Sequence, residues 1–187
     1  MNLRMLTGGR VLAGPPILAA GAVTCAAVLV PANALASAGP PAPVARTVAP
    51  PCASSGVDVW LDTQGNGAAG RIYYHLEFTN LSGSTCALFG FPGVSGISLN
   101  GAQLGSAAAW DQGRTPRVVT LASGATARAR LAIVDVGVFS PSQCQQVTAA
   151  GLRVFLPGQG RSRVVPFPFA ACSKSGPNYL VVRAVRK

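Results

Sequence analysis

Apolar and polar residues alternate along much of this chain, and this pattern predicts β-strands. The clearest stretch alternates Ile72, Tyr74, Leu76 and Phe78 with Arg71, Tyr73, His75 and Glu77. Successive side chains of a strand point to opposite faces. The stretch therefore predicts an antiparallel sheet with one face packed on a core and the other in water.

Similar patterns predict further strands. They occur at residues 57–62, 97–99, 118–121, 127–133, 152–156, 164–169 and 179–185. We expect a turn at residues 64–67 (Gln-Gly-Asn-Gly), which end the first of these strands, and a surface loop around Trp110. One short helix is expected within residues 137–150, starting near Ser140 and Pro141, because serine followed by proline is a typical helix start.

The many short strands decide the expected fold class. Glycine and proline, 22 and 15 residues respectively, interrupt the chain too often for long helices. About eight or nine closely spaced strands with no helices between them favour an immunoglobulin-like antiparallel β-sandwich over an α/β fold.

Residues 1–36 have the features of an export signal. Arg4 and Arg10 supply positive charge, residues 11–30 are largely apolar, and residues 34–36 (Ala-Leu-Ala) fit the small-x-small rule of signal peptidase. The sequence therefore predicts a signal peptide over residues 1–36 and a secreted or extracellular protein, with association to the cell envelope as a further option.

Two other interpretations of the leader stay open. It could be a retained membrane anchor, but the apolar run of residues 17–30 is shorter than the roughly 20 residues that a spanning helix needs. It could carry a lipid on Cys25, but Thr24 stands where a lipidation motif has a smaller residue. We expect no transmembrane segment in the mature form.

The mature chain divides into a spacer and one domain. Residues 37–51 are rich in proline and are expected to be extended. Residues 52–187 are long enough for one hydrophobic core, so we expect a single domain and a monomer.

Four cysteines remain once Cys25 is removed with the leader. They are Cys52, Cys86, Cys144 and Cys172. An even number in an exported chain predicts two disulfides, with three possible connectivities. Zinc is the rival explanation, but no two of these cysteines form a C-x-x-C pair and His75 is the only histidine. We expect no metal and no cofactor.

Charge is the feature that folding explains least. Without Arg4 and Arg10, 13 basic residues (15 − 2) face 5 acidic ones, a formal net charge of +8 (13 − 5). Such a domain is attracted to anionic polymers. The candidate binding residues are Arg128, Arg130, Arg161, Arg163 and the aromatic Trp110. Other basic residues of interest are Arg183, Arg186 and Lys187. Solubility alone is the competing explanation, and nucleic acid is not an expected partner.

Candidate catalytic groups are few. His75 is predicted on the solvent face, and no serine lies in a Gly-x-Ser-x-Gly motif. A glycan hydrolase would need two facing carboxylates, which Glu77 could form with Asp58 or Asp62 on a neighbouring strand if they lie within about 10 Å. We expect no enzymatic activity, and this hydrolase is the alternative.

Several motifs together resemble a known family. They are Cys52, Tyr-x-Leu-x-Phe-Thr-Asn at residues 74–80, Cys-x-Leu-x-Gly-Phe-Pro-Gly-Val at 86–94, Val-Thr-Leu-x-x-Gly-x-x-Ala at 119–127, Cys144 and Cys172. In this order and spacing, over about residues 52–185, the chain resembles the actinobacterial domain of unknown function 4232. The resemblance implies an exported or lipid-anchored immunoglobulin-like sandwich in the cell envelope and no established activity.

The expected function is a non-enzymatic binding module that contacts an anionic envelope polymer or another exported protein. Two alternatives stay open beside it: the envelope glycan hydrolase with Glu77, and a purely structural secreted protein. The last of these predicts a surface without a concave pocket.

Overall fold

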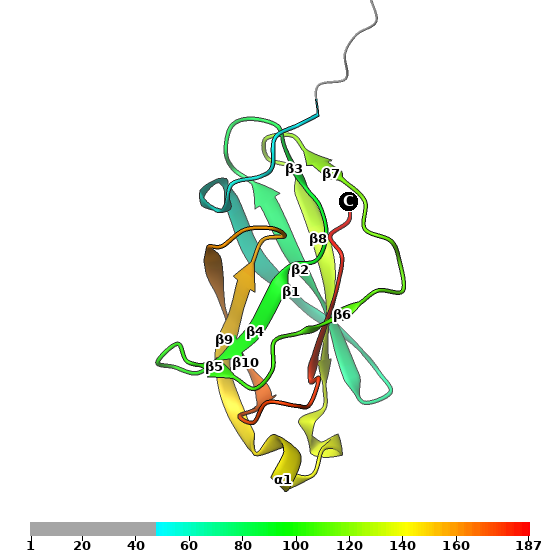
Figure 1. The fold of residues 1–187 in the computed structure, drawn as a ribbon, viewed down its shortest axis with the longest axis vertical. Coiled ribbons are helices and arrows are strands. Elements are labelled where there is room, and N and C mark those ends of the chain that lie inside the picture. The colour runs from blue at the N-terminus through cyan, green and yellow to red at the C-terminus, as the bar shows by residue number, and fades with distance from the viewer. Residues whose placement is uncertain (1–47) are drawn as a thin grey trace, which may run out of the picture. The chain divides into compact units, whose positions relative to one another are not determined.

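A computed structural model describes residues 48–187 of the chain. The predicted signal peptide (1–36) and residues 37–47 of the predicted spacer lie outside the described residues. The described part is an all-β sandwich of a five-stranded and a four-stranded sheet, with a small two-stranded sheet at one end (Figure 1). The predicted all-β sandwich with two disulfides is confirmed, while its immunoglobulin-like character stays a prediction.

The five-stranded sheet has the order β1-β2-β8-β11-β6. Its strands are β1 (Val57–Ala68), β2 (Arg71–Asn80), β8 (Thr126–Val134), β11 (Leu180–Arg183) and β6 (Ala109–Asp111). Neighbouring strands are antiparallel except β6 and β11, which run parallel. The expectation of an antiparallel sandwich thus holds except at this edge.

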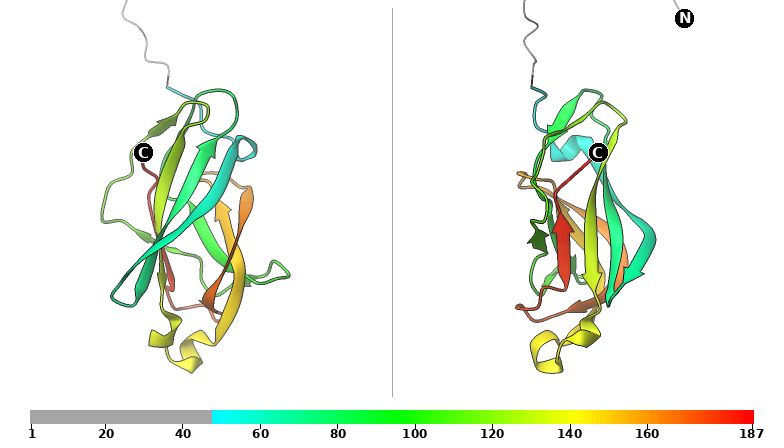
Figure 2. Two further views of the ribbon diagram at one scale, coloured as in Figure 1. Left: turned by 180° about the vertical axis from the view of Figure 1, so that it is seen from behind. Right: turned by 90° about the vertical axis from the view of Figure 1, so that its right-hand side faces the viewer.

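The four-stranded sheet has the order β10-β9-β4-β5, and β3 pairs with β7. These strands are β10 (Ser162–Cys172), β9 (Gln146–Phe155), β4 (Gly93–Ile97), β5 (Gln103–Leu104), β3 (Cys86–Leu88) and β7 (Val119–Leu121). The helical elements are η1 (Ser54–Gly56), η2 (Val136–Val138) and α1 (Pro141–Cys144). The helix α1 lies at the end of the sandwich opposite β3 and β7, as all three views show (Figures 1 and 2).

The hydrophobic core lies between the two large sheets. Leu76, Phe78 and Leu131 are fully buried there, as the alternation of β2 and β8 predicts. Ile72 belongs to the same face of β2 but is 45% exposed, because it lies near the tip of the β1–β2 hairpin, beside the open end of the sandwich.

The turn of the β1–β2 hairpin lies further along the chain than predicted. We expected it at residues 64–67, but β1 continues to Ala68, and the turn is made by Ala69 and Gly70, with φ of 46° and 72°. Positive φ at both central residues fits the right-handed twist of a hairpin. A register irregularity between Asp62 and Asn66 accommodates the glycine-rich segment inside the strand.

Trp110 is in a strand and not in the expected surface loop. It is the central residue of β6, and its Cα partner is Val182 in β11. The pairing joins segments about seventy residues apart in sequence, so the local pattern around Trp110 could not indicate it.

The single α-helix begins where the sequence predicts. Ser140 is its N-cap, Pro141 is its first residue, and a capping box joins Ser140 to Gln143. The helix ends after one turn at Gln145, which has φ of 49°.

Two disulfides connect the four cysteines in sequential order. Cys52 is bonded to Cys86 and Cys144 to Cys172, with Cα atoms 4.8 Å and 4.6 Å apart. The expected disulfides are therefore confirmed, and of the three possible connectivities the structure has this one. The first ties the start of the domain to β3, and the second ties α1 to β10.

A buried amide network fixes the end of β2. The side-chain nitrogen of Asn80 donates to the carbonyl oxygens of Ser84 (2.7 Å), Leu121 (3.0 Å) and Ala122 (3.2 Å). The Asn80 side-chain oxygen accepts from the backbone N–H and the hydroxyl of Ser82. Asn80 is fully buried, so the last residue of the Tyr-x-Leu-x-Phe-Thr-Asn motif serves the fold.

The edge strand of the four-stranded sheet contains two prolines. Pro166 and Pro168 lie in β10, where the pairing with β9 is irregular between Pro166 and Phe169. Proline has no backbone N–H to donate and is found in sheets on edges and at bulges.

Candidate functional site

The candidate site is the face of the five-stranded sheet that points away from the core, which we call the outer face. Its side chains come from alternate positions of neighbouring strands. They are Asp58, Trp60 and Asp62 of β1, Tyr73, His75 and Glu77 of β2, Arg128 and Arg130 of β8, Arg183 of β11 and Asp111 of β6. Acidic groups thus gather over β1 and β2 and basic groups over β8 and β11.

Glu77 is the unusual residue of the outer face. Alternation predicts that it lies in water, but it is only 8% exposed. Its direct neighbours across the strands are Trp60 and Arg128. Glu77 makes no hydrogen bond or ion pair with any residue of the described range, and its carboxylate oxygens keep some contact with solvent.

Arg130 has partners that hold its guanidinium group in place. It lies 4.6 Å from the ring centroid of Tyr73 and 3.7 Å from a carboxylate oxygen of Asp111. Arg183 donates to the same oxygen at 2.6 Å. This hydrogen bond, with one from the backbone N–H of Gly113 and the nearby positive charges, lowers the pKa of Asp111 below its usual value.

Arg128 belongs to a different environment. Its backbone exchanges two hydrogen bonds with Arg186, of 2.7 Å and 2.8 Å. Directly opposed residues of an antiparallel pair point to the same side of the sheet, and like charges there repel each other. Arg186 also lines a cavity of about 350 Å³ with Arg117 and Lys187.

We call Arg117, Arg128, Arg186 and Lys187 the basic cluster. Among residues 48–187, none of its members forms an ion pair. The sequence pointed to Arg128, Arg186 and Lys187, but their contact could not be foreseen because 58 residues (186 − 128) separate the two arginines. Arg117 was missed, since nothing near it in the sequence marks it as part of a surface.

Arg161 and Arg163, the second predicted arginine pair, lie elsewhere. They lie at the start of β10, in the other sheet, and line a cavity of about 510 Å³ with Ser54 and Ser55. Arg163 donates to the backbone oxygen of Ser54 at 2.7 Å. The structure therefore does not bring the two predicted pairs together on one surface.

Trp110, the predicted binding aromatic, is 57% exposed. Its ring stacks on that of Phe91, with centroids 5.0 Å apart and planes at 8°. One face of the indole is thereby used within the protein, while much of the side chain stays accessible at the β6 edge.

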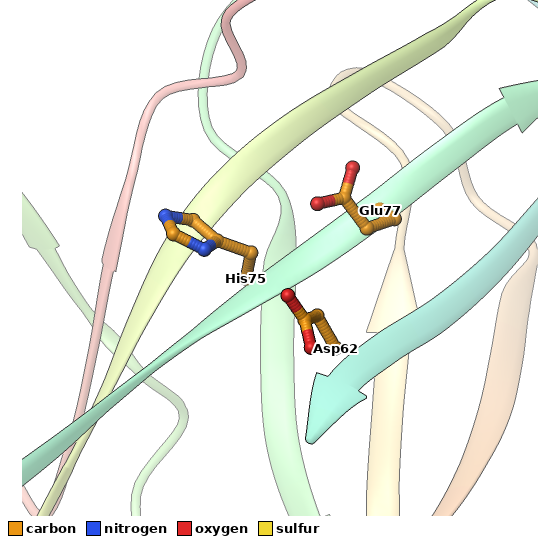
Figure 3. A group of neighbouring side chains, drawn as sticks. All are labelled: Asp62, His75 and Glu77. Atoms are coloured by element: carbon orange, nitrogen blue, oxygen red, sulfur yellow. The ribbon is translucent and has the colours of Figure 1, made fainter. Parts of the chain in front are cut away.

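The acidic half of the outer face contains a compact group of three side chains. Asp62 comes from β1, and His75 and Glu77 come from β2 (Figure 3). One potential ligand atom from each lies within 4.8 Å of the others. Asp62 and Glu77 are thus well within the 10 Å limit for the glycan hydrolase, but they lie side by side on adjacent strands, and the cavities described here have other linings.

An apolar cleft opens at the end of the sandwich near the β1–β2 hairpin. It has a volume of about 510 Å³, and Tyr74, Phe167 and Phe169 line it. The Tyr74 and Phe167 rings meet edge to face, with centroids 5.1 Å apart. Arg71 and Asp135 are its charged lining residues. A purely structural protein was expected to lack such a concavity, and that alternative stays open as a prediction.

The fold and these surfaces define a disulfide-bonded, all-β domain with a charged outer face. Residues 52–186 match the family described as "Domain of unknown function (DUF4232)". The match covers more than half of the chain, and the protein belongs to this family. No curated protein and no solved structure matches it.

One further structural finding concerns membranes. Over residues 48–187, no helix is long and apolar enough to cross a bilayer.

Proposed function

We propose that this protein is a secreted, non-enzymatic binding module that contacts an anionic polymer of the cell envelope through its basic cluster. The sequence supports export through the features of residues 1–36, and the two disulfides agree with an oxidising compartment. The positive charge of the mature chain supports an anionic partner.

The observation that carries the proposal is the pairing of Arg128 with Arg186. Two arginines directly opposite each other repel, which costs stability unless an anion lies between or above them. No acidic side chain of the described residues forms an ion pair with either, although Glu77 of β2 lies directly opposite Arg128 on the other side of β8. Arg130 and Arg183, in contrast, already share Asp111 and are less available for a ligand.

The proposal is tested by co-sedimentation of the oxidised protein with anionic vesicles and with purified wall polymer, at low and high salt. A basic residue close to an anionic surface contributes about 1 kcal/mol. The double variant R128A/R186A should therefore bind roughly 25-fold more weakly than the natural protein at low salt, from about 2 kcal/mol in total. High salt should weaken binding of both.

The matched control is R71A/R161A, which removes the same net charge from two exposed arginines outside the basic cluster. It should lose much less affinity than R128A/R186A. Equal losses would show that only the total charge matters and would refute the basic cluster as the contact. No binding at any salt would refute an anionic envelope polymer and favour an exported protein as the partner.

A further inference from the structure

We propose that Asp62, His75 and Glu77 form a binding site for a divalent transition metal ion of the Zn²⁺ class. This site lies on the acidic half of the outer face. It uses other residues than the proposed contact with an anionic polymer, although Arg128 of the basic cluster lies directly opposite Glu77.

The sheet fixes the positions of the three side chains. Asp62 and His75 are directly opposite each other across β1 and β2. Glu77 follows His75 by two residues, so it projects from the same face of the strand. Asp62 is further oriented by the backbone N–H of Gln64, which donates to its Oδ1 at 3.0 Å. Rigid strands and such supporting contacts hold metal ligands in place.

Glu77 is the independent sign of a missing positive charge. The residue is only 8% exposed, no donor of the described residues reaches its carboxylate, and the carboxylate oxygens keep some contact with solvent. Arg128, directly opposite, forms no ion pair with it, because no nitrogen of Arg128 lies within 4.0 Å of its carboxylate. A carboxylate with restricted access to water and no hydrogen-bond partner is stabilised by a cation bound beside it.

The neighbouring arginine leaves the site free. Arg130 is the partner of His75 across β2 and β8, but its guanidinium group is held over Tyr73 and toward Asp111. The charge of Arg130 is therefore partly balanced on the side away from Asp62 and Glu77.

The ligand types favour a transition metal. One imidazole nitrogen and two carboxylate oxygens are ligands that Zn²⁺ accepts at about 2.0–2.2 Å. Ca²⁺ and Mg²⁺ prefer sites made only of oxygen. Around a tetrahedral ion, ligand atoms lie about 3.4 Å apart. The imidazole nitrogens of His75 lie more than 4.0 Å from the carboxylate oxygens of Asp62 and Glu77. One ligand atom from each of the three residues lies within 4.8 Å of the other two. Small side-chain rotations would therefore bring the three atoms to the spacing that a bound ion requires.

The test is a Zn²⁺ titration of the purified, oxidised full chain, freed of any histidine tag and followed by calorimetry. One Zn²⁺ per chain is expected, with no comparable binding of Ca²⁺ or Mg²⁺. Because His75 is the only histidine, its imidazole NMR signals should shift or broaden on addition of Zn²⁺. This readout would place the ion at His75.

Two variants and one control complete the test. E77Q and D62N each keep the side-chain shape while removing a charged ligand, and each should weaken Zn²⁺ binding at least tenfold. D58N is the matched control, because Asp58 is an exposed carboxylate of the same strand outside the group, and it should bind within about twofold of the natural protein. If E77Q fails to fold, the Zn²⁺ affinity of D62N alone tests the proposal. Absent binding, unchanged His75 signals or unchanged affinity in D62N would overturn the proposal.

Discussion

The substitution Asn80→Asp tests how much the buried amide network contributes to stability. It exchanges the amide nitrogen for an oxygen with almost no change in shape. The three carbonyl oxygens of Ser84, Leu121 and Ala122 would lose their donor and face a carboxylate instead. The contacts of Ser82 with the other oxygen can persist. The substitution thus isolates the donor side of the network.

The expected loss follows from the burial and the bond count. An amide nitrogen has two hydrogens, and each hydrogen bond contributes about 0.5–1.5 kcal/mol, which gives about 1–3 kcal/mol. An uncompensated charge in a fully buried position brings the total to about 3–5 kcal/mol at neutral pH. This is a large share of the roughly 5–15 kcal/mol that a domain has.

The effect should depend on pH in a known direction. Burial beside carbonyl oxygens would raise the pKa of an aspartate at position 80 above the unfolded value of about 3.9. The charge penalty is then present at neutral pH and is lost as the pH falls toward the unfolded pKa. The destabilisation of N80D should therefore be smaller at pH 4 than at pH 7.

The assay is urea unfolding under oxidising conditions, followed by circular dichroism at both pH values. Asn100→Asp is the matched control, because Asn100 is exposed and its side chain only accepts hydrogen bonds. It should change stability by less than about 0.5 kcal/mol. If N80D and N100D were equally stable, the reasoning about the network would be refuted.

Two more predictions concern the disulfides and the buried tyrosine. Replacing Cys52 and Cys86 by serine should lower stability by roughly 3–4 kcal/mol, because the bond closes a loop with a sequence separation of 34; urea unfolding that shows under 1 kcal/mol of change would contradict this. Burial raises the pKa of Tyr179 to about 12, against the lowering effect of a hydrogen bond with the Gly96 backbone. Stability should thus fall between about pH 10 and 12, where the unfolded tyrosine ionises and the folded one does not. Ultraviolet titration should show one of the three tyrosines ionising last, and uniform ionisation near pH 10 would contradict the burial.

The sequence predicts local structure well where the pattern itself encodes it. The alternation of residues 71–78 identifies β2 and its buried face, and the Ser140–Pro141 pair identifies the start of α1. The even number of cysteines predicts two disulfides. In each case the signal lies within a few residues, or in the cysteine count.

The remaining features depend on contacts between distant segments. β6 is a three-residue edge strand without alternation, so only its pairing with β11 makes it a strand. The burial of Glu77 depends on β1 and β8 lying on both sides of it. The basic cluster forms because the C-terminal segment returns to lie beside β8. Single-sequence patterns carry no information about such neighbours.

The prolines of β10 have a consequence for self-association. An edge strand with free backbone groups can template the addition of a strand from another molecule. Pro166 and Pro168 leave two positions of this edge strand without an N–H donor, while β5 and β6, at two other edges, contain only two and three residues. The remaining long edge, β1, is made irregular between Asp62 and Asn66. Each of these features makes backbone pairing with a strand of another molecule less favourable at the edge where it occurs.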